Sequence, residues 1–277
     1  MLKKSFTNFF IVGIASILAV AIVFYGGEDK QNVQPQDGNM QNLLQDAVFS
    51  IGPLSRVEKK ARGAAVKVLE SEGYGSGTYV TYKGFHLVIT AYHVVKDSPF
   101  NIVEIQSQSE QIARGKIVHT QPNNDFAVVS IPNKIKGMKP IKLKTRKTFP
   151  DVGTELTYSG FPNNHDVVTF RGRVAGFENT PKGESILLHT YGWFGASGSG
   201  VYDSDGYLVG ILWAVSVGKA WGDLQIVEDI AYVSPTSSLD LDAMFDGICK
   251  ESPSDPQCII HNKINDLRNP QPIETNK

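Results

Sequence analysis

Residues 195–200 read Gly-Ala-Ser-Gly-Ser-Gly, and this short stretch decides how the rest of the sequence is interpreted. Upstream, residues 89–95 read Ile-Thr-Ala-Tyr-His-Val-Val, and residues 123–129 between the two read Asn-Asn-Asp-Phe-Ala-Val-Val. A histidine, an aspartate and a serine therefore follow one another along the chain, each in a local context suited to acyl transfer. Each motif alone is common, so the interpretation rests on their joint order, spacing and strand-rich surroundings.

The chemistry of acyl transfer explains why these three residue types occur together. A serine hydroxyl is a weak nucleophile at neutral pH and needs a neighbouring base to take its proton. We expect Ser197 to be the nucleophile, His93 the base that later returns the proton, and Asp125 the group that orients the imidazole. The backbone N–H groups of Gly195 and Ser197 are expected to form the oxyanion hole, in a tight loop that glycine permits.

Further motifs give the chain a resemblance to trypsin-like serine peptidases, and it looks closest to the HtrA (Deg) type. The segments that carry the resemblance are Gly75–Thr78 with Leu87–Val95, Asp125–Val129, Val152–Gly153 with Gly160–Pro162, Gly195–Gly200 with Asp205–Ile211, and Ala231–Pro235. They run from about residue 60 to residue 246. The resemblance implies a serine endopeptidase with peptide or protein substrates and no cofactor. Too few residues follow for the PDZ-like domain of the HtrA proteins.

The sequence departs from the family pattern near the nucleophile. Ala196 stands where relatives carry Asp or Asn, which argues against activation by pairing with a newly cut N-terminus. Ser199 replaces the usual glycine, and Trp193 and Phe194 are bulkier than usual. Trp213 stands where relatives have a serine that supports the aspartate. These differences bear on substrate specificity and efficiency more than on the three catalytic residues.

The resemblance also implies which residues wall the specificity pocket. They belong to two segments, and we expect Tyr191, Phe194, Trp213, Ala214 and Val215 to bind substrate. Neither segment contains a carboxylate, and burying an unpaired Arg or Lys side chain is costly. We therefore expect cleavage after small or medium apolar residues.

Short apolar or alternating runs recur through the middle of the chain and predict an all-β fold. Twelve strands are expected at 64–69, 77–82, 86–91, 102–106, 112–119, 127–131, 155–159, 167–177, 185–189, 200–202, 208–214 and 226–233. They suit two six-stranded antiparallel β-barrels, chymotrypsin-like in the resemblance, that divide near the Lys-rich connector Pro132–Lys147. Helices are expected at Pro53–Arg62 and at Thr236–Phe245, the second capped by Ser234 or Thr236.

The N-terminus predicts export and a membrane anchor. Lys3 and Lys4 precede an uncharged, largely apolar run from Phe9 to Tyr25, which at 17 residues is at the short end for a membrane span. The acidic pair after it, Glu28-Asp29, favours a cytoplasmic N-terminus and an extracytoplasmic catalytic domain. A cleaved signal peptide is the alternative, because Ala19-Val20-Ala21 is a possible cleavage site, and would make the protein secreted.

Four segments follow from these patterns. They are a transmembrane signal anchor at 1–26, a flexible linker at 27–52, the peptidase domain at 53–246 and a loosely ordered tail at 247–277. The tail holds the chain's two cysteines, Cys249 and Cys258, for which an exported location permits a local disulfide; two free thiols are the alternative.

Composition restricts the classes of ligand. With 27 Lys and Arg against 28 Asp and Glu, the formal net charge is −1. The composition therefore lacks the excess of positive charge that is typical of nucleic-acid binding. The five histidines other than His93 show no spacing typical of metal ligands, so no metal site is expected. The oligomeric state stays open.

Two alternatives to a peptidase remain. The first is a pseudoprotease that binds extended peptides without cutting them, which Trp213 and the bulky residues beside the nucleophile motivate. The second is an esterase or another acyl hydrolase that uses the same three residues.

Overall fold

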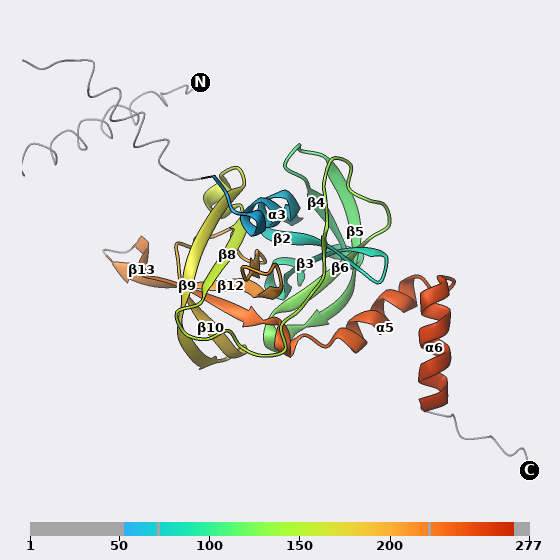
Figure 1. Ribbon diagram of the computed structural model, residues 1–277. Coiled ribbons are helices and arrows are strands. Elements are labelled where there is room, and N and C mark those ends of the chain that lie inside the picture. The colour runs from blue at the N-terminus through green and yellow to red at the C-terminus, as the bar shows by residue number, and fades with distance from the viewer. Residues whose placement is uncertain (1–52, 71–72, 221–222, 269–277) are drawn as a thin grey trace, which may run out of the picture. The chain divides into compact units, whose positions relative to one another are not determined.

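The computed structural model describes residues 53–70, 73–220 and 223–268 (Figure 1). All the described elements belong to one compact unit, Leu54–Lys277. The expected anchor (1–26) and the expected linker (27–52) both lie outside the described residues. Among the residues that are described, no helix is long and apolar enough to cross a membrane.

The first barrel contains the strands of the N-terminal half. They are β1 (Ala65–Glu70), β2 (Gly73–Tyr82), β3 (Phe85–Ala91), β4 (Ile102–Gln106), β5 (Ile112–Gln121) and β6 (Phe126–Ile131). Their order is β1-β4-β5-β6-β3-β2, and antiparallel pairing of β1 with β2 closes the barrel. Strand β7 (Ile141–Lys142), in the connector, adds to β2 in parallel.

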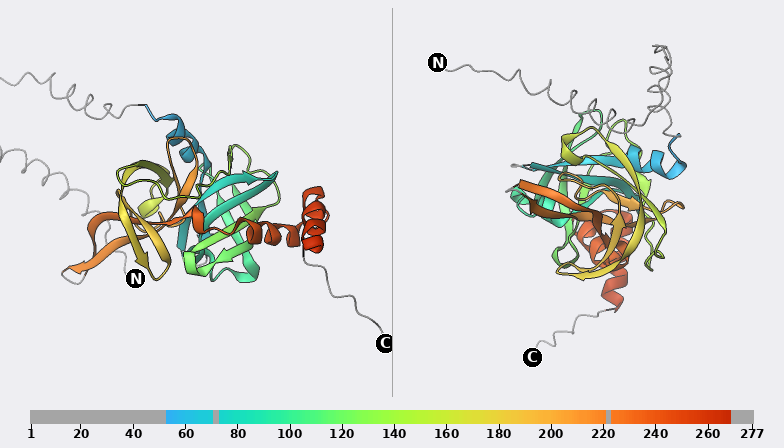
Figure 2. Two further views of the ribbon diagram at one scale, coloured as in Figure 1. Left: turned by 60° about the horizontal axis from the view of Figure 1, so that its bottom comes forward. Right: turned by 90° about the vertical axis from the view of Figure 1, so that its left-hand side faces the viewer.

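The second barrel contains β8 (Glu155–Gly160), β9 (Val168–Thr180), β10 (Gly183–His189), β11 (Gly200–Tyr202), β12 (Leu208–Ala220) and β13 (Asp223–Pro235). Their order is β10-β13-β12-β11-β8-β9, closed by β9 with β10. The two barrels lie side by side in Figures 1 and 2. The prediction of two six-stranded antiparallel barrels is confirmed, with each of the twelve strands overlapping its expected range.

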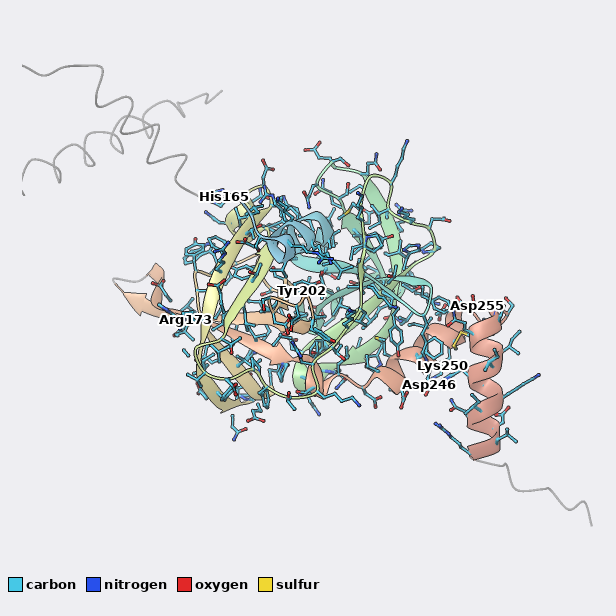
Figure 3. The ribbon with its side chains drawn as sticks, viewed as in Figure 1. His165, Arg173, Tyr202, Asp246, Lys250 and Asp255 are labelled. Atoms are coloured by element: carbon cyan, nitrogen blue, oxygen red, sulfur yellow. A yellow bond between two sulfur atoms is a disulfide. The ribbon has the colours of Figure 1, made fainter. Side chains whose placement is uncertain are left out.

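Each barrel encloses its own apolar core, because alternate side chains of every strand point inward. Val66, Leu87, Ile89, Ile105 and Val128 are among those of the first core, and Leu156, Ile186, Leu188, Leu212 and Val233 among those of the second. Tyr202, Leu208 and Ile211 come from the second barrel but pack in the first cluster. These three residues therefore form part of the apolar contact that joins the barrels, and Figure 3 shows Tyr202 between them.

The expected helix before the first strand is α3 (Arg56–Ala64), which begins with a capping box of Ser55 and Glu58. Two short 3-10 turns, η1 (Pro99–Asn101) and η3 (Pro162–Asn164), lie in loops. After β13 come η4 (Thr236–Ser238), α5 (Leu241–Glu251) and α6 (Pro256–Arg268). Met244, Phe245 and Ile248 of α5 join the first core.

The C-terminal region differs from the prediction in two ways. Helix α5 begins at Leu241 rather than at Thr236, because the Asp240 carboxylate caps it by accepting from the N–H groups of Asp242 and Ala243. Thr236 does not cap the helix, because its hydroxyl donates to the Leu208 carbonyl at 2.7 Å. The expected loosely ordered tail is helical as far as Arg268, and Pro256 stands at the first position of α6, where a missing N–H costs nothing.

Cys249 of α5 and Cys258 of α6 are joined by a disulfide. Figure 3 shows this yellow bond near Asp255, where α5 meets α6. A hydrogen bond of 2.6 Å between His261 Nε2 and Asp246 Oδ1 also connects the two helices. The second helix is therefore tied to the first by both a covalent and a polar contact.

Candidate active site

Asp125 lies at the exit of a one-turn 3-10 helix, η2 (Pro122–Asn124), immediately before β6. Its backbone adopts the left-handed conformation (φ 56°), which aspartate tolerates better than most residues. Its side chain is fully buried. The Gln121 side chain holds the loop by donating to the Ser238 carbonyl at 2.8 Å and accepting from Asp240 N–H at 2.9 Å. The start of η2 is thus fixed against the segment that leads into α5.

His93 lies on a four-residue helical turn, α4 (Tyr92–Val95), directly after β3. Its Nδ1 lies 2.6 Å from Asp125 Oδ2, and its backbone N–H donates to Asp125 Oδ1 at 2.9 Å. Both carboxylate oxygens therefore hold the same residue. Because a carboxylate only accepts, Nδ1 carries the proton, and the neutral ring has its lone pair at Nε2. The side chain is 40% exposed, so the ring is open to an incoming molecule.

The loop between β10 and β11, residues 190–199, carries the expected nucleophile Ser197, and we call it the nucleophile loop. It contains a type II turn. Ala196 N–H donates to the Trp193 carbonyl at 3.0 Å, and Gly195 has φ +92°, which a side chain would strain. The Phe194 carbonyl accepts from Asn163 N–H at 2.7 Å. Since C=O and N–H point in opposite directions across a trans peptide, Gly195 N–H points away from Asn163. Within the described chain, neither Gly195 N–H nor Ser197 N–H has a hydrogen-bond acceptor, so both are available to an incoming oxyanion.

Gly198 is required for a different reason. Its φ is +90°, and a Cβ there would lie 2.0 Å from the Ser76 carbonyl oxygen and 2.3 Å from Thr90 Oγ1. Only glycine permits the loop to pass this close to the first barrel. The Gly198 N–H also donates to the Leu212 carbonyl at 2.7 Å, which ties the loop to β12.

Ser76, on β2 of the first barrel, holds the nucleophile loop of the second. Its N–H donates to the Ser197 carbonyl at 2.7 Å, and its hydroxyl donates to the Gly195 carbonyl at 2.6 Å. The same hydroxyl accepts from Phe161 N–H at 3.0 Å. Sequence reasoning named Ser76 only as part of the Gly75–Thr78 motif and assigned it no role. The Gly75-Ser76-Gly77 pattern was the available signal, but it does not reveal a partner 119 positions away.

Ser197 Oγ makes no hydrogen bond to the histidine ring. It lies 3.5 Å from the Trp213 carbonyl oxygen, a long hydrogen bond, and none joins it to His93. Catalytic hydrogen bonds are often longer or poorly aligned in the absence of substrate and tighten when it binds. The structure therefore brings His93 and Asp125 into direct contact and leaves Ser197 in a loop that the first barrel holds in place.

The five expected pocket residues lie around this loop but differ in exposure. Tyr191 and Phe194 are 42% and 54% exposed. Trp213 is partly buried, and its indole N–H donates to Ser185 Oγ at 3.4 Å. Ala214 and Val215 are partly buried in β12. A Cβ on Gly192 would lie 2.4 Å from Val215 Cγ1, so the Val215 side chain fills the space beside Gly192.

No group of three or more His, Cys, Asp or Glu side chains among the described residues could hold a metal ion. The groups in this region that can take part in a reaction are the His93–Asp125 pair, the Ser197 hydroxyl and two free backbone N–H donors. Together they can accept a proton, attack a carbonyl and stabilise an oxyanion.

Comparison with known proteins bears on this arrangement. Residues 75–211 match the family described as trypsin-like peptidase domain. No curated protein matches the chain significantly. Among solved structures, the Rv3671c protease of M. tuberculosis H37Rv, in an inactive form, is 16% identical with a TM-score of 0.54, over 67% of this chain and 89% of that one. A serine endoprotease from Yersinia pestis is 21% identical with a TM-score of 0.51, over 67% of this chain and 64% of that one. At these identities the structural likeness supports the fold.

Proposed function

Residues 75–211 belong to the trypsin-like peptidase family, and on that premise we propose that the chain is a serine endopeptidase whose triad is Ser197, His93 and Asp125. The observation that carries the proposal is the two-point contact of Asp125 with His93, at 2.6 and 2.9 Å. This contact fixes the tautomer that a general base requires. The Trp193–Ala196 turn supports the proposal, because the N–H groups of Gly195 in this turn and of Ser197 after it are free of protein acceptors.

The reaction follows from these positions. His93 Nε2 takes the proton of Ser197 as its oxygen attacks the peptide carbonyl, and the N–H groups of Gly195 and Ser197 stabilise the oxyanion. His93 then gives the proton to the leaving amine, which leaves an acyl group on Ser197. Water hydrolyses this ester with His93 again acting as base, and no cofactor takes part. Buried Asp125 stabilises the imidazolium that forms in both steps.

Single substitutions test this assignment. We expect Ser197→Ala and His93→Ala each to lower kcat by roughly four to six orders of magnitude, and the double variant to lose no more, because the residues act as one unit. Asp125→Asn should cost roughly 10⁴-fold, since it favours the wrong tautomer. Initial rates on a casein-derived peptide pool, with circular dichroism to verify folding, measure the effect. Substantial activity in a folded Ser197→Ala variant would exclude the proposed nucleophile.

A catalytically inactive peptide-binding protein is the second candidate. The observation that favours it is the orientation of Ser197 Oγ toward the Trp213 carbonyl rather than toward His93. On this reading, wild type and Ser197→Ala would bind peptides with equal affinity and neither would release product. Turnover of simple esters by the wild type, lost in Ser197→Ala, with no turnover of peptides would instead indicate another acyl hydrolase.

The pocket beside the nucleophile supports a preference for small or medium apolar residues before the cleaved bond. Val215 occupies the space next to Gly192, and the expected pocket residues include no carboxylate to pair with a cation. Replacing Val215 with glycine should deepen the pocket and move the preference from Ala and Val toward Leu and Phe. Mass spectrometry of products from a peptide library measures the preference. Dominant cleavage after Arg or Lys in the wild type would contradict it.

The place of action belongs to the same proposal. The run Phe9–Tyr25 would anchor the protein in a membrane, with Lys3 and Lys4 on the cytoplasmic side and the catalytic domain outside the cytoplasm. The charge asymmetry across this run supports it. A mature chain beginning near Ile22 would replace the anchor with a cleaved signal peptide.

A further inference from the structure

One surface of the peptidase unit collects lysines that the catalytic mechanism does not use. Lys59 and Lys60 of α3, together with Lys139 and Lys142 of the connector, line a single hollow. We call these four residues the lysine patch. The other lining residues are Gly63, Gly137, Pro140 and Ile141, so the hollow contains no carboxylate.

The charges of the lysine patch are not neutralised by the protein. All four lysine side chains are exposed, and among the described residues none of their ammonium groups has an ion-pair or hydrogen-bond partner. Other basic residues nearby are paired, as Arg171 is with Glu58 and Arg146 with Asp203. Four unpaired like charges around one hollow repel one another, so an anion that binds there relieves the repulsion.

The sequence concentrates positive charge in this region. The connector at 132–147 contains six lysines and one arginine and no acidic residue, whereas the whole chain has a formal net charge of −1. An even distribution of charge would not produce such a block. A contiguous basic block is typical of a surface that meets a polyanion.

The position of the lysine patch favours a membrane as that polyanion. Helix α3 is the first described element, so residues 1–52 join the unit through it, and Lys59 follows Pro53 by only six positions. If Phe9–Tyr25 is the anchor, the linker attaches to the helix that carries half of the lysine patch. A tether raises the effective concentration of the surface next to its attachment point. Lysines near an anionic leaflet are attracted to it within about one Debye length, roughly 8 Å at physiological salt.

We propose that the lysine patch docks the peptidase unit onto an anionic lipid surface. The lysines contact phosphate groups of the lipids, and the apolar Pro140 and Ile141 in the same hollow face the boundary between headgroups and acyl chains. The inference rests on the proposed anchor for the choice of a membrane as the polyanion; the unpaired charges are independent of it. Docking fixes which side of the unit faces the membrane and so limits which substrates reach the active site.

Lysine footprinting of the full chain tests the proposal. The protein is reconstituted into vesicles of phosphatidylcholine, alone or with 30% phosphatidylglycerol (roughly the fraction needed for a strong surface potential), acetylated briefly and digested for mass spectrometry. We expect the four lysines to be acetylated at least about threefold less in the anionic vesicles, and 0.5 M NaCl to abolish the difference (Debye length roughly 4 Å). Lys250 and Lys263 are the internal controls, because they are exposed and unpaired on α5 and α6. Their labelling should be the same in both vesicles.

Charge reversal gives a matched comparison. Lys59→Glu with Lys60→Glu should remove the protection of Lys139 and Lys142, whereas Lys250→Glu with Lys263→Glu, the same change in net charge, should leave it intact. Equal acetylation of the lysine patch in both vesicles overturns the proposal. Protection by a DNA duplex or an acidic polypeptide, with none by vesicles, also overturns it.

Two further measurements separate this result from the proposed function. Carbonate extraction of the same vesicles reports whether the chain is anchored, and hydrolysis of a soluble peptide reports the peptidase activity. If carbonate extraction shows that the chain is not anchored, the same chain is added to preformed vesicles of the same two compositions. The lysine patch should still be protected there, in a salt-dependent manner.

Discussion

At the scale of single residues, the site depends on a serine that does no chemistry. The Ser76 side chain is fully buried, and its hydroxyl is used twice, once as donor to Gly195 and once as acceptor from Phe161. Removing the hydroxyl leaves two buried backbone groups unsatisfied, which costs about 1–3 kcal/mol. The Gly195 carbonyl belongs to the turn that directs the expected oxyanion donors. Ser76 is therefore a positioning residue.

We predict that Ser76→Ala lowers kcat by roughly 10- to 100-fold with little change in KM, because a displaced oxyanion donor weakens binding of the transition state alone. Ser199→Ala is the matched control. Ser199 is also buried close to Gly160, but within the described chain its hydroxyl has no hydrogen-bond partner. The control should keep its activity and match or exceed wild-type stability in urea. Equal kinetics in the two variants would contradict the role of Ser76.

The three expected catalytic residues could be named from the sequence because each occurs in a short motif. How these residues lie relative to one another could not be predicted from the sequence. The His93–Asp125 contact spans 32 positions, and the Ser76–Gly195 contact spans 119. Sequence patterns report the local environment of a residue, whereas the first contact depends on how β3 and β6 pair within one barrel and the second on how the two barrels meet.

At the scale of elements, one ion pair fastens α3 to the second barrel. Arg171 of β9 donates to both carboxylate oxygens of Glu58, each at 2.7 Å. The hydrogen bonds from Arg171 have the largest effect on Glu58 and lower its pKa to about 2. Burial is the next largest effect and acts in the opposite direction. Glu58 also accepts from Ser55 N–H at 2.6 Å, so one side chain caps the helix and pairs with the strand.

This pKa predicts how stability changes with pH. Between its ordinary pKa of 4.5 and the folded value of about 2, Glu58 binds fewer protons in the folded than in the unfolded chain. Its contribution is therefore complete above pH 4.5 and is lost as the pH falls toward 2. We expect Glu58→Gln to cost about 1–3 kcal/mol of unfolding free energy at pH 7 and progressively less as the pH falls toward 2.5.

Urea unfolding at both pH values measures the effect. Glu104→Gln is the control, because its pair with Arg114 lies on the surface, with the two side chains 43% and 77% exposed. An exposed pair contributes about 0–1 kcal/mol, so the control should differ little from wild type at either pH. A constant Glu58→Gln difference across the two pH values would contradict the linkage.

The elements were predictable to different degrees. Short apolar or alternating runs were sufficient for all twelve barrel strands. The helix expected at Pro53–Arg62 was found as α3, and the structure adds the Ser55–Glu58 capping box at its start. The two-residue strand β7 was missed because so short a parallel pairing leaves no periodic pattern. The start of α5 was misplaced because Thr236 is an equally good cap in isolation, but its hydroxyl bonds to β12 instead. Helix α6 was missed because its flanking prolines favoured a loop, although the disulfide that joins it to α5 was expected from the chain's two cysteines.

At the scale of the whole molecule, the arrangement depends on contact between the barrels. His93 and Asp125 come from the first barrel and Ser197 from the second. The barrels are joined by a buried hydrogen bond between Thr78 Oγ1 and Tyr202 OH at 2.5 Å, and by the hydrogen bonds of Ser76. Burial raises the pKa of the Tyr202 hydroxyl, which therefore stays neutral at this interface. A division into two barrels with an intervening connector could be predicted from strand number, but this interface could not.

The most direct test of the account is covalent labelling of the intact protein with a fluorophosphonate, which reacts with a serine only when a base has activated it. We expect a single adduct by intact mass, located at Ser197 by peptide mapping. Ser197→Ala and His93→Ala should gain no mass, although both remain folded. A folded wild-type protein that stays unlabelled under conditions in which trypsin is fully modified, or one labelled equally after Ser197→Ala, would contradict the central claim.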